Sequence, residues 1–130
     1  MTCFWKAILE TLNPTEKQIL GLGNNANEYD LVYALKDKSY FLLNAKVKWQ
    51  NEVISEQLCG ELKQWIDAYE TENISEGHDT SSCDPFLTLL CELFGWNIVF
   101  NYQFVRIYFE NMYKTTRTVT FGANSFHFYV

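Results

Sequence analysis

The chain has 130 residues, the usual length of one domain, and a single domain over residues 1–130 is therefore expected. Hydrophobic residues make up 48% and aromatic residues 17%, which is enough to fill a core without a metal or disulfide staple. With 10 Lys and Arg against 16 Asp and Glu, the net charge is −6, and no nucleic-acid partner is expected because phosphate binders cluster cations. An acidic surface suits a basic protein ligand, and it also serves solubility alone.

The cysteines, Cys3, Cys59, Cys83 and Cys91, are irregularly spaced and form no CxxC pair. This spacing favours reduced thiols over a zinc ribbon or a redox motif. No charged-then-apolar leader opens the sequence, and the apolar runs are far shorter than the roughly 18 residues of a membrane span. A soluble cytoplasmic monomer without membrane contact is the expectation.

The spacing of apolar residues predicts the helices. The pattern is clearest over residues 52–69, where large apolar side chains recur at intervals of three and four. Asp84 is a suitable N-cap, Pro85 is tolerated at the first helical position and Gly95 supplies a stop, so another helix is expected between them. The other expected segments are a helix over residues 3–12, a short helical turn over 14–23, a helix over 27–36 and an exposed polar loop over 71–82.

The end of the chain is rich in β-branched and aromatic residues, which predicts strands. These runs cover residues 97–102, 104–110, 117–121 and 126–130. Helices therefore come first and a sheet last, which is typical of the α+β class. We expect N-terminal helices packed on one face of a C-terminal, mostly antiparallel sheet.

Cys3 and His127 are the candidate catalytic residues. Cys3 lies in the first turn of the expected N-terminal helix, where the helix amides lower the pKa of a thiol. His127, on a strand at the other end of the chain, can reach Cys3 as a base once the sheet packs against that helix. Taken singly, each residue type is more often buried in a core than catalytic.

Three blocks of sequence strengthen this interpretation. Cys3-Phe-Trp-Lys-Ala-Ile8 resembles the nucleophile motif of the ovarian-tumour (OTU) cysteine proteases, which are deubiquitinases. Residues 84–100 are similar to the late helix and strand of that family, and Phe126-His127-Phe128 resembles its final strand with the catalytic histidine. Residues 13–82 carry no such motif and are compatible with the family's variable helical arm, which binds the substrate protein.

The resemblance implies a papain-like OTU fold with Cys3 as the nucleophile and His127 as the base. It implies hydrolysis of isopeptide or peptide bonds after the C-terminal glycine of ubiquitin or a ubiquitin-like modifier, with no cofactor. Met1 and Thr2 stand where the family has Asp-Gly, and Tyr129 stands where it has an Asp or Asn that orients the histidine. The short N-terminus suggests a minimal viral version or a piece cut from a polyprotein.

Alternatives remain open at this point. The departures from the family motif fit a ubiquitin-binding module of the same fold whose catalysis has lapsed, and a structural or adaptor protein with a buried Cys3 is a further possibility. Asn97 and Asn124 are candidates for the residue that orients the histidine, by residue type only. His78 lies in the polar loop and is interpreted as a surface residue outside the site, and irregular spacing disfavours a metal site built from it and the cysteines. Trp49 and Trp65 are expected in the core by default, with presentation of aromatic surface to a partner as the alternative.

Overall fold

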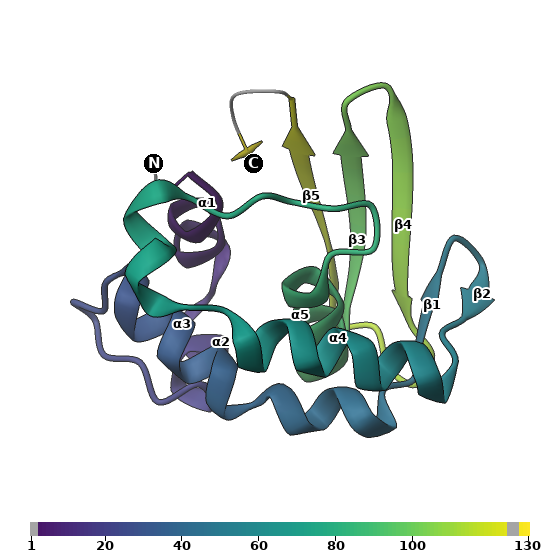
Figure 1. Ribbon diagram of the computed structural model, residues 1–130, viewed down its shortest axis with the longest axis horizontal. Helices are drawn as coiled ribbons and strands as arrows, with labels where there is room; N and C mark the ends of the chain where they lie inside the picture. Colours follow the sequence, from purple (N-terminus) through teal and green to yellow (C-terminus); the bar gives the residue numbers. More distant parts are fainter. Residues whose placement is uncertain (1–2, 125–127) are drawn as a thin grey trace.

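A computed structural model describes residues 3–124 and 128–130, with the backbone alone at Cys3 and Glu76. It has the α+β architecture expected from the sequence, with helices and one six-stranded sheet (Figure 1). The helices are α1 (Cys3–Thr11), α2 (Pro14–Ile19), α3 (Glu28–Asp37), α4 (Glu56–Ala68) and α5 (Pro85–Phe94), with 3₁₀ helices η1 (Ser39–Asn44) and η2 (Thr71–Glu76). The strands are β1 (Val47–Trp49), β2 (Glu52–Val53), β3 (Trp96–Tyr102), β4 (Val105–Asn111), β5 (Arg117–Ala123) and β6 (Phe128–Tyr129).

The strands follow the order β2-β1-β4-β3-β5-β6 across the sheet. Among the described strands, β3 and β5 pair in parallel and every other neighbouring pair is antiparallel. The sheet is therefore mixed but mostly antiparallel. After β4, the chain passes the end of the sheet where β3 begins and enters β5 on the other side of β3 (Figure 1). Strands β5 and β6 therefore form the edge nearest α1.

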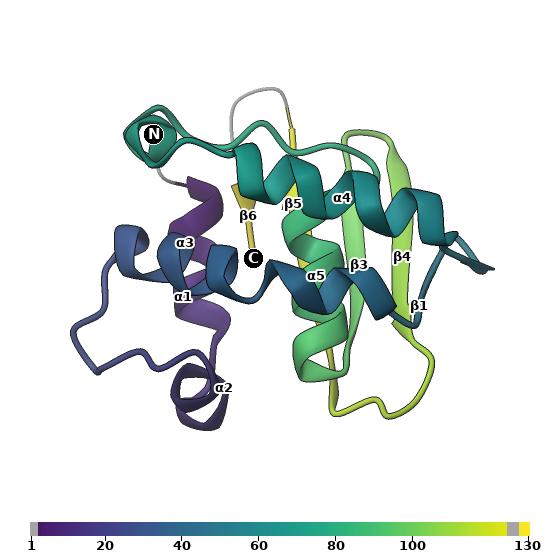
Figure 2. The ribbon, with the colours of Figure 1, turned by 60° about the horizontal axis from the view of Figure 1, so that its bottom comes forward.

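Helices α4 and α5 and the 3₁₀ helix η1 cover one face of the sheet, whereas α1, α2 and α3 lie beyond its β6 edge (Figure 2). Helix α5 lies against β3 and β4, and α4 and η1 pack beyond it. Strand β4 shows the same asymmetry, because Ile107 and Phe109 are buried while Arg106 and Tyr108 face outward. The core that results is aromatic, with Trp5, Phe86, Trp96, Phe100, Phe109 and Phe121 among its largest buried side chains.

The expected limits of α5 are confirmed by its caps. The Asp84 carboxylate accepts hydrogen bonds from the backbone N–H groups of Phe86 and Leu87, and Pro85 takes the first helical position. Gly95 closes the helix with φ +67°, and a Cβ there would lie 2.2 Å from the Lys114 carbonyl oxygen. Only glycine fits this turn without displacing the backbone.

The middle of the chain differs from the expectation. Residues 52–53 form β2 instead of helix, and α4 begins at Glu56 because the Ser55 hydroxyl accepts the Leu58 N–H as an N-cap. The β1–β2 hairpin was missed because its strands are very short. Its turn residues Gln50 and Asn51 adopt φ of +53° and +68° without the Asn-Gly pair that usually signals such a turn.

Two further expectations are wrong. The segment 71–82 is not simply an exposed loop, because it forms η2 and buries Ile74 completely. Trp65 is not a core residue, since 71% of its surface remains accessible on α4. Trp49 is half-buried and packs against the core.

An ion pair between buried Glu16 and partly exposed Arg117 joins the first helices to the sheet. Glu16 is 5% exposed, and its carboxylate accepts hydrogen bonds from the Arg117 guanidinium at 2.6 Å and from the Trp96 indole N–H at 2.5 Å. Arg117 also donates to the Thr11 carbonyl oxygen at 2.7 Å and lies over the Trp96 ring. The C-terminal end of α1 is therefore fixed to the first residues of β3 and β5.

Replacing Glu16 with Ala is expected to lower the free energy of unfolding by about 3 kcal/mol, because the Arg117 and Trp96 donors lose their acceptor. Urea unfolding measures the loss. Lys63→Met is the control, since it breaks an exposed ion pair with Asp67 and should cost less than about 0.5 kcal/mol. A Glu16→Ala loss no larger than that of the control would contradict the role of the buried pair.

Candidate functional site

The two ends of the described chain meet where α1 begins. Phe4 is 2% exposed, and its ring packs edge-on against that of Phe128 in β6, with centroids 4.7 Å apart. Helix α1 and strand β6 are in contact along this edge (Figure 2). Phe4 follows Cys3 in the sequence and Phe128 follows His127, so the immediate neighbours of both predicted catalytic residues touch.

The predicted catalytic residues themselves are described only in part. Cys3 is the first residue of α1, and its side chain lies outside the described part of the chain. His127 lies outside the described residues. The predicted Cys3–His127 pair therefore stays a prediction, and the described geometry around it is the contact between α1 and β6.

The register of the sheet excludes Asn97 as the residue that orients the His127 imidazole. Phe128 pairs with Ala123, whereas Asn97 pairs with Thr118, five residues and roughly 16 Å earlier along β5. The Asn97 amide oxygen instead accepts hydrogen bonds from the Asn111 N–H at 3.2 Å and the Thr115 hydroxyl at 3.3 Å. Asn97 is thus a structural residue at the opposite end of the sheet.

Asn124 follows the last residue of β5, at the end of the sheet where β6 pairs. Tyr129, which stands where the family has an Asp or Asn, lies across Gly122 of the neighbouring strand. A Cβ on Gly122 would come within 2.3 Å of the Tyr129 ring. Glycine at this position therefore lets the Tyr129 ring approach the backbone of β5.

The interpretation of His78 as a surface residue is wrong. Its Nε2 lies 2.7 Å from Oδ2 of Asp84, and the two side chains are only 10% and 0% exposed. The imidazole packs among the rings of Phe4, Trp5, Tyr69 and Phe86, with centroid distances of 4.6, 5.5, 5.8 and 5.2 Å. Because Phe4 and Trp5 directly follow Cys3, the His78–Asp84 pair supports the first turn of α1.

Asp84 connects this pair to α5. Its Oδ1 accepts the two N–H groups that begin the helix, and its Oδ2 accepts the Ser81 N–H at 3.3 Å as well as facing His78. A fully buried carboxylate is stable only when such donors replace its hydration. The Asp84 carboxylate therefore holds both His78 and the Ser81 backbone within segment 77–84.

The same segment is attached to the sheet at two further points. The Trp49 indole N–H donates to the Ser82 carbonyl oxygen at 3.0 Å, and the Tyr102 hydroxyl donates to the Thr80 carbonyl oxygen at 3.3 Å. These bonds and the His78–Asp84 contact hold the segment at intervals of two residues. We call residues 77–84 the bridging segment, because it crosses from η2 to α5 (Figure 1).

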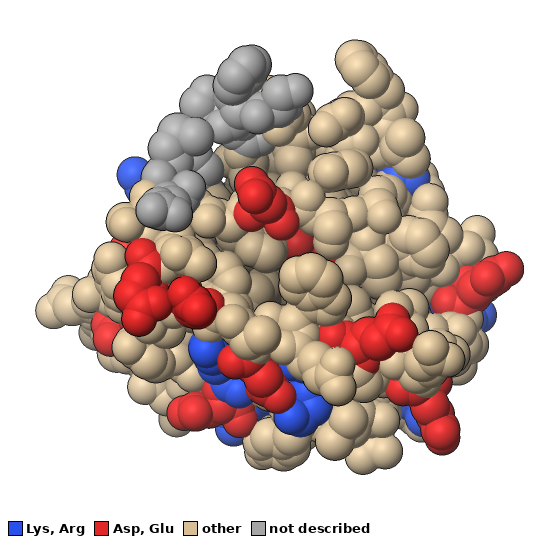
Figure 3. All heavy atoms as spheres, in the orientation of Figure 1, with Lys and Arg blue, Asp and Glu red and all other residues tan. Residues whose placement is uncertain are grey.

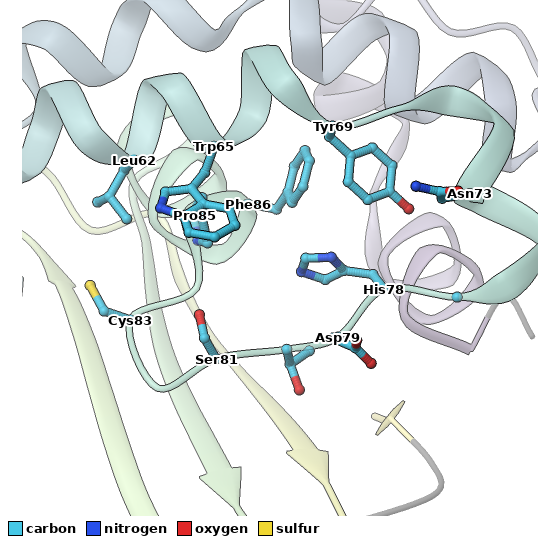
Figure 4. Close-up of a pocket in the computed structure, with 12 residues that line it drawn as sticks. Leu62, Trp65, Tyr69, Asn73, His78, Asp79, Ser81, Cys83, Pro85 and Phe86 are labelled. Carbon is cyan, nitrogen blue, oxygen red and sulfur yellow. The ribbon is translucent and has the colours of Figure 1, made fainter.

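A pocket of about 690 Å³ lies between the bridging segment, α4 and the start of α5 (Figure 4). Its walls are aromatic and apolar on the helices and polar on the segment. The lining residues are Leu62, Trp65, Tyr69, Asn73, Gly77, His78, Asp79, Thr80, Ser81, Cys83, Pro85 and Phe86. In Figure 4 the His78 ring lies between the bridging segment and the aromatic side chains of α4 and α5.

The cysteines whose side chains are described are poor nucleophile candidates. Burial raises the pKa of the Cys83 thiol to about 11 and raises the pKa of Cys91 still further. Burial also raises the pKa of Cys59. All of these thiols are protonated at neutral pH and lack the thiolate that attacks a carbonyl. Among the described residues, no group of three or more His, Cys, Asp or Glu side chains is arranged to hold a metal ion.

Comparison of the chain with protein-family models, curated proteins and solved structures found no match. The functional interpretation therefore depends on the geometry and chemistry of the described residues. Of the helices in the described chain, none has the length and apolar character that crossing a bilayer requires.

Replacing His78 with Ala is expected to lower the free energy of unfolding by about 2 kcal/mol, because the aromatic cluster loses a packed ring and buried Asp84 loses a partner. Urea unfolding followed by tryptophan fluorescence measures this. Asp79→Asn changes the adjacent, exposed carboxylate and should stay within about 0.5 kcal/mol of the wild type. Equal losses in the two variants would refute the supporting role of His78.

Proposed function

We propose that the chain is a cysteine hydrolase of the OTU type, with Cys3 as the nucleophile and His127 as the base. Its substrate is ubiquitin or a ubiquitin-like modifier, cleaved after the C-terminal glycine. The observation that carries the proposal is the contact of Phe4 with Phe128, at a centroid distance of 4.7 Å. These residues directly follow the two proposed catalytic residues, and they meet although they lie at opposite ends of the chain.

In the proposed reaction, the Cys3 sulfur attacks the glycine carbonyl carbon and His127 takes the thiol proton. His127 then gives this proton to the leaving amine, and the acyl group stays on Cys3 as a thioester. Water attacks the thioester with His127 again as the base, which releases the carboxylate and restores the thiol. Backbone N–H groups at the start of α1 are the proposed donors to the oxyanion.

The way α1 is anchored supports this assignment. Arg117 fixes the carbonyl of Thr11 at the C-terminal end of the helix, and the His78 ring packs on Phe4 and Trp5 at its beginning. A nucleophile works best on a rigid element whose position is set by surrounding contacts. The described α+β arrangement is compatible with the papain-like fold that we propose, in which the nucleophile helix packs against the sheet that carries the histidine.

The chemistry of the rest of the chain is consistent with the proposal. The mechanism requires no cofactor. The net charge of −6 favours association with a modifier whose C-terminal tail is basic. We propose that the protein acts as a monomer in the cytoplasm, where thiols stay reduced.

A ubiquitin whose C-terminus carries a thiol-reactive group is expected to form one covalent adduct, at Cys3. Cys83 and Cys91 should not react, because burial raises their pKa and keeps them protonated. Peptide mapping by mass spectrometry locates the adduct. Cys3→Ala should abolish it, and Cys83→Ala is the matched control that should keep it.

The outcomes of this experiment separate the candidate functions. Tight, non-covalent binding of the probe without an adduct would indicate a ubiquitin-binding module whose catalysis has lapsed. Neither binding nor an adduct would indicate an adaptor with another partner. An adduct confined to Cys59, Cys83 or Cys91 would refute the assignment of the nucleophile.

His127→Ala is expected to reduce turnover of a ubiquitin substrate by about 10²-fold or more, because proton transfer in the transition state is lost. The dissociation constant for ubiquitin should change by no more than about threefold, since the base contributes little to ground-state binding. Steady-state kinetics and a binding titration measure the two effects separately. Turnover equal to that of the wild type would exclude His127 as the base.

A further inference from the structure

An unusually exposed tryptophan stands at the mouth of the pocket between α4 and the bridging segment. Trp65 is 71% exposed, whereas Leu62 and Ile66 on the same helix are 4% and 0% exposed. A large aromatic side chain left in water beside a cavity is typical of a binding surface. In Figure 4 the indole lies at the side of the pocket opposite Asn73.

The pocket has a defined shape because its polar wall is fixed. Hydrogen bonds to the sheet hold the carbonyls of Thr80 and Ser82, and Asp84 holds His78. The volume of about 690 Å³ lies within the range of small-ligand sites, roughly 300–1,000 Å³. A pre-formed site of this size can take one long side chain together with part of its flanking backbone.

The charges of the lining select the ligand. Among the described residues that line the pocket, none is Lys or Arg, and Asp79 contributes an exposed carboxylate. The Asp79 charge also acts on Tyr69, whose pKa is raised mainly by burial and further by this carboxylate. His78 contributes little positive field because its Nε2 faces the Asp84 carboxylate at 2.7 Å. An anionic ligand is therefore disfavoured.

The surface around the pocket also carries negative charge. The net charge is −6, and Figure 3 shows acidic side chains on this face and no Lys or Arg atoms in its middle, above α4. A guanidinium group matches this lining better than an ammonium group does. It is planar and weakly hydrated, it stacks on an indole face, and its N–H groups can reach several acceptors at once.

We propose that the pocket binds an arginine side chain presented by a protein partner, with its guanidinium stacked on Trp65 and its charge favoured by the Asp79 carboxylate elsewhere on the lining. Ser81 on the polar wall, which lies on the Trp65 side of the pocket in Figure 4, offers an acceptor for the guanidinium N–H groups. The site goes beyond the proposed hydrolase activity and does not depend on it, because neither Cys3 nor His127 contributes to the lining described.

The experiment titrates the full chain with the capped tripeptide acetyl-Gly-Arg-Gly-amide and follows the tryptophan indole N–H signals by NMR. The chain has 4 tryptophans, and Trp65→Phe assigns the signal of interest. The Trp65 signal should shift in a saturable way. The Trp96 signal is an internal control and should not move, because its N–H is buried against Glu16.

Charge and aromatic stacking are then tested separately. A peptide with citrulline in place of arginine keeps the shape without the charge, and it should bind at least about fivefold more weakly. Asp79→Asn should weaken arginine binding by about threefold, and Trp65→Ala, which lacks the indole signal and is therefore measured by isothermal titration calorimetry, by about tenfold or more. Tyr113→Ala and Asp37→Asn remove an exposed aromatic ring and a carboxylate elsewhere, and both should leave binding unchanged.

The proposal is overturned if citrulline or norleucine peptides bind as tightly as the arginine peptide, or if binding survives in Trp65→Ala. Both pocket variants alter exposed side chains, and an unchanged urea unfolding curve shows that they remain folded. Cys3→Ala should bind the peptide normally. The peptide result is therefore independent of the ubiquitin-probe result, and either proposal can fail without the other.

Discussion

The partly buried ion pair between Glu16 and Arg117 is the constraint on which the rest of the arrangement depends. It lies where the α1–α2 turn meets the beginning of the parallel strands β3 and β5, and it also engages Trp96 and the last turn of α1. Charges in such a place are retained only when every partner is positioned correctly. The pair therefore fixes the C-terminal end of α1 beside the beginning of β3 and β5, while the N-terminal end of α1 lies near β6.

Asp84 has a comparable role at the other end of α1. One carboxylate starts α5, organises the bridging segment and holds His78 against Phe4 and Trp5. The proposed nucleophile helix is thus located by two buried carboxylates, at positions 16 and 84, neither of which is proposed to take part in the chemistry. The polar wall of the arginine pocket is formed by the same bridging segment, so the two proposed sites share their support.

The elements that the sequence predicts well are those encoded by local contacts. Helix α5 is framed by Asp84 and Gly95, and the β-branched and aromatic residues of β3 to β5 favour strands. The β1–β2 hairpin was missed because strands of two or three residues give no periodic signal. Its pairing with β4 depends on residues some sixty positions away.

In the candidate site, too, the residues in short motifs could be predicted and those placed by distant contacts could not. Cys3 and Phe128 stand in short motifs, whereas the partnership of His78 with Asp84 exists only because an aromatic cluster from three separate parts of the chain encloses the ring. The sequence held one indication that the segment around His78 is packed, because the apolar residue Ile74 interrupts this polar stretch and is fully buried. The exposure of Trp65 had no local signal, since its position on the apolar stripe of α4 predicted burial.

The contact between α1 and β6 also bears on the order of assembly. Phe4 and Phe128 close almost the longest loop that the chain can form, and loop closure costs more entropy as the loop lengthens. Among the described residues, β6 pairs with β5 at Gly122 and Ala123, so this surface for α1 depends on β5 having paired with β3. Helix α1 precedes the sheet in the sequence, yet it is expected to dock on it late in folding.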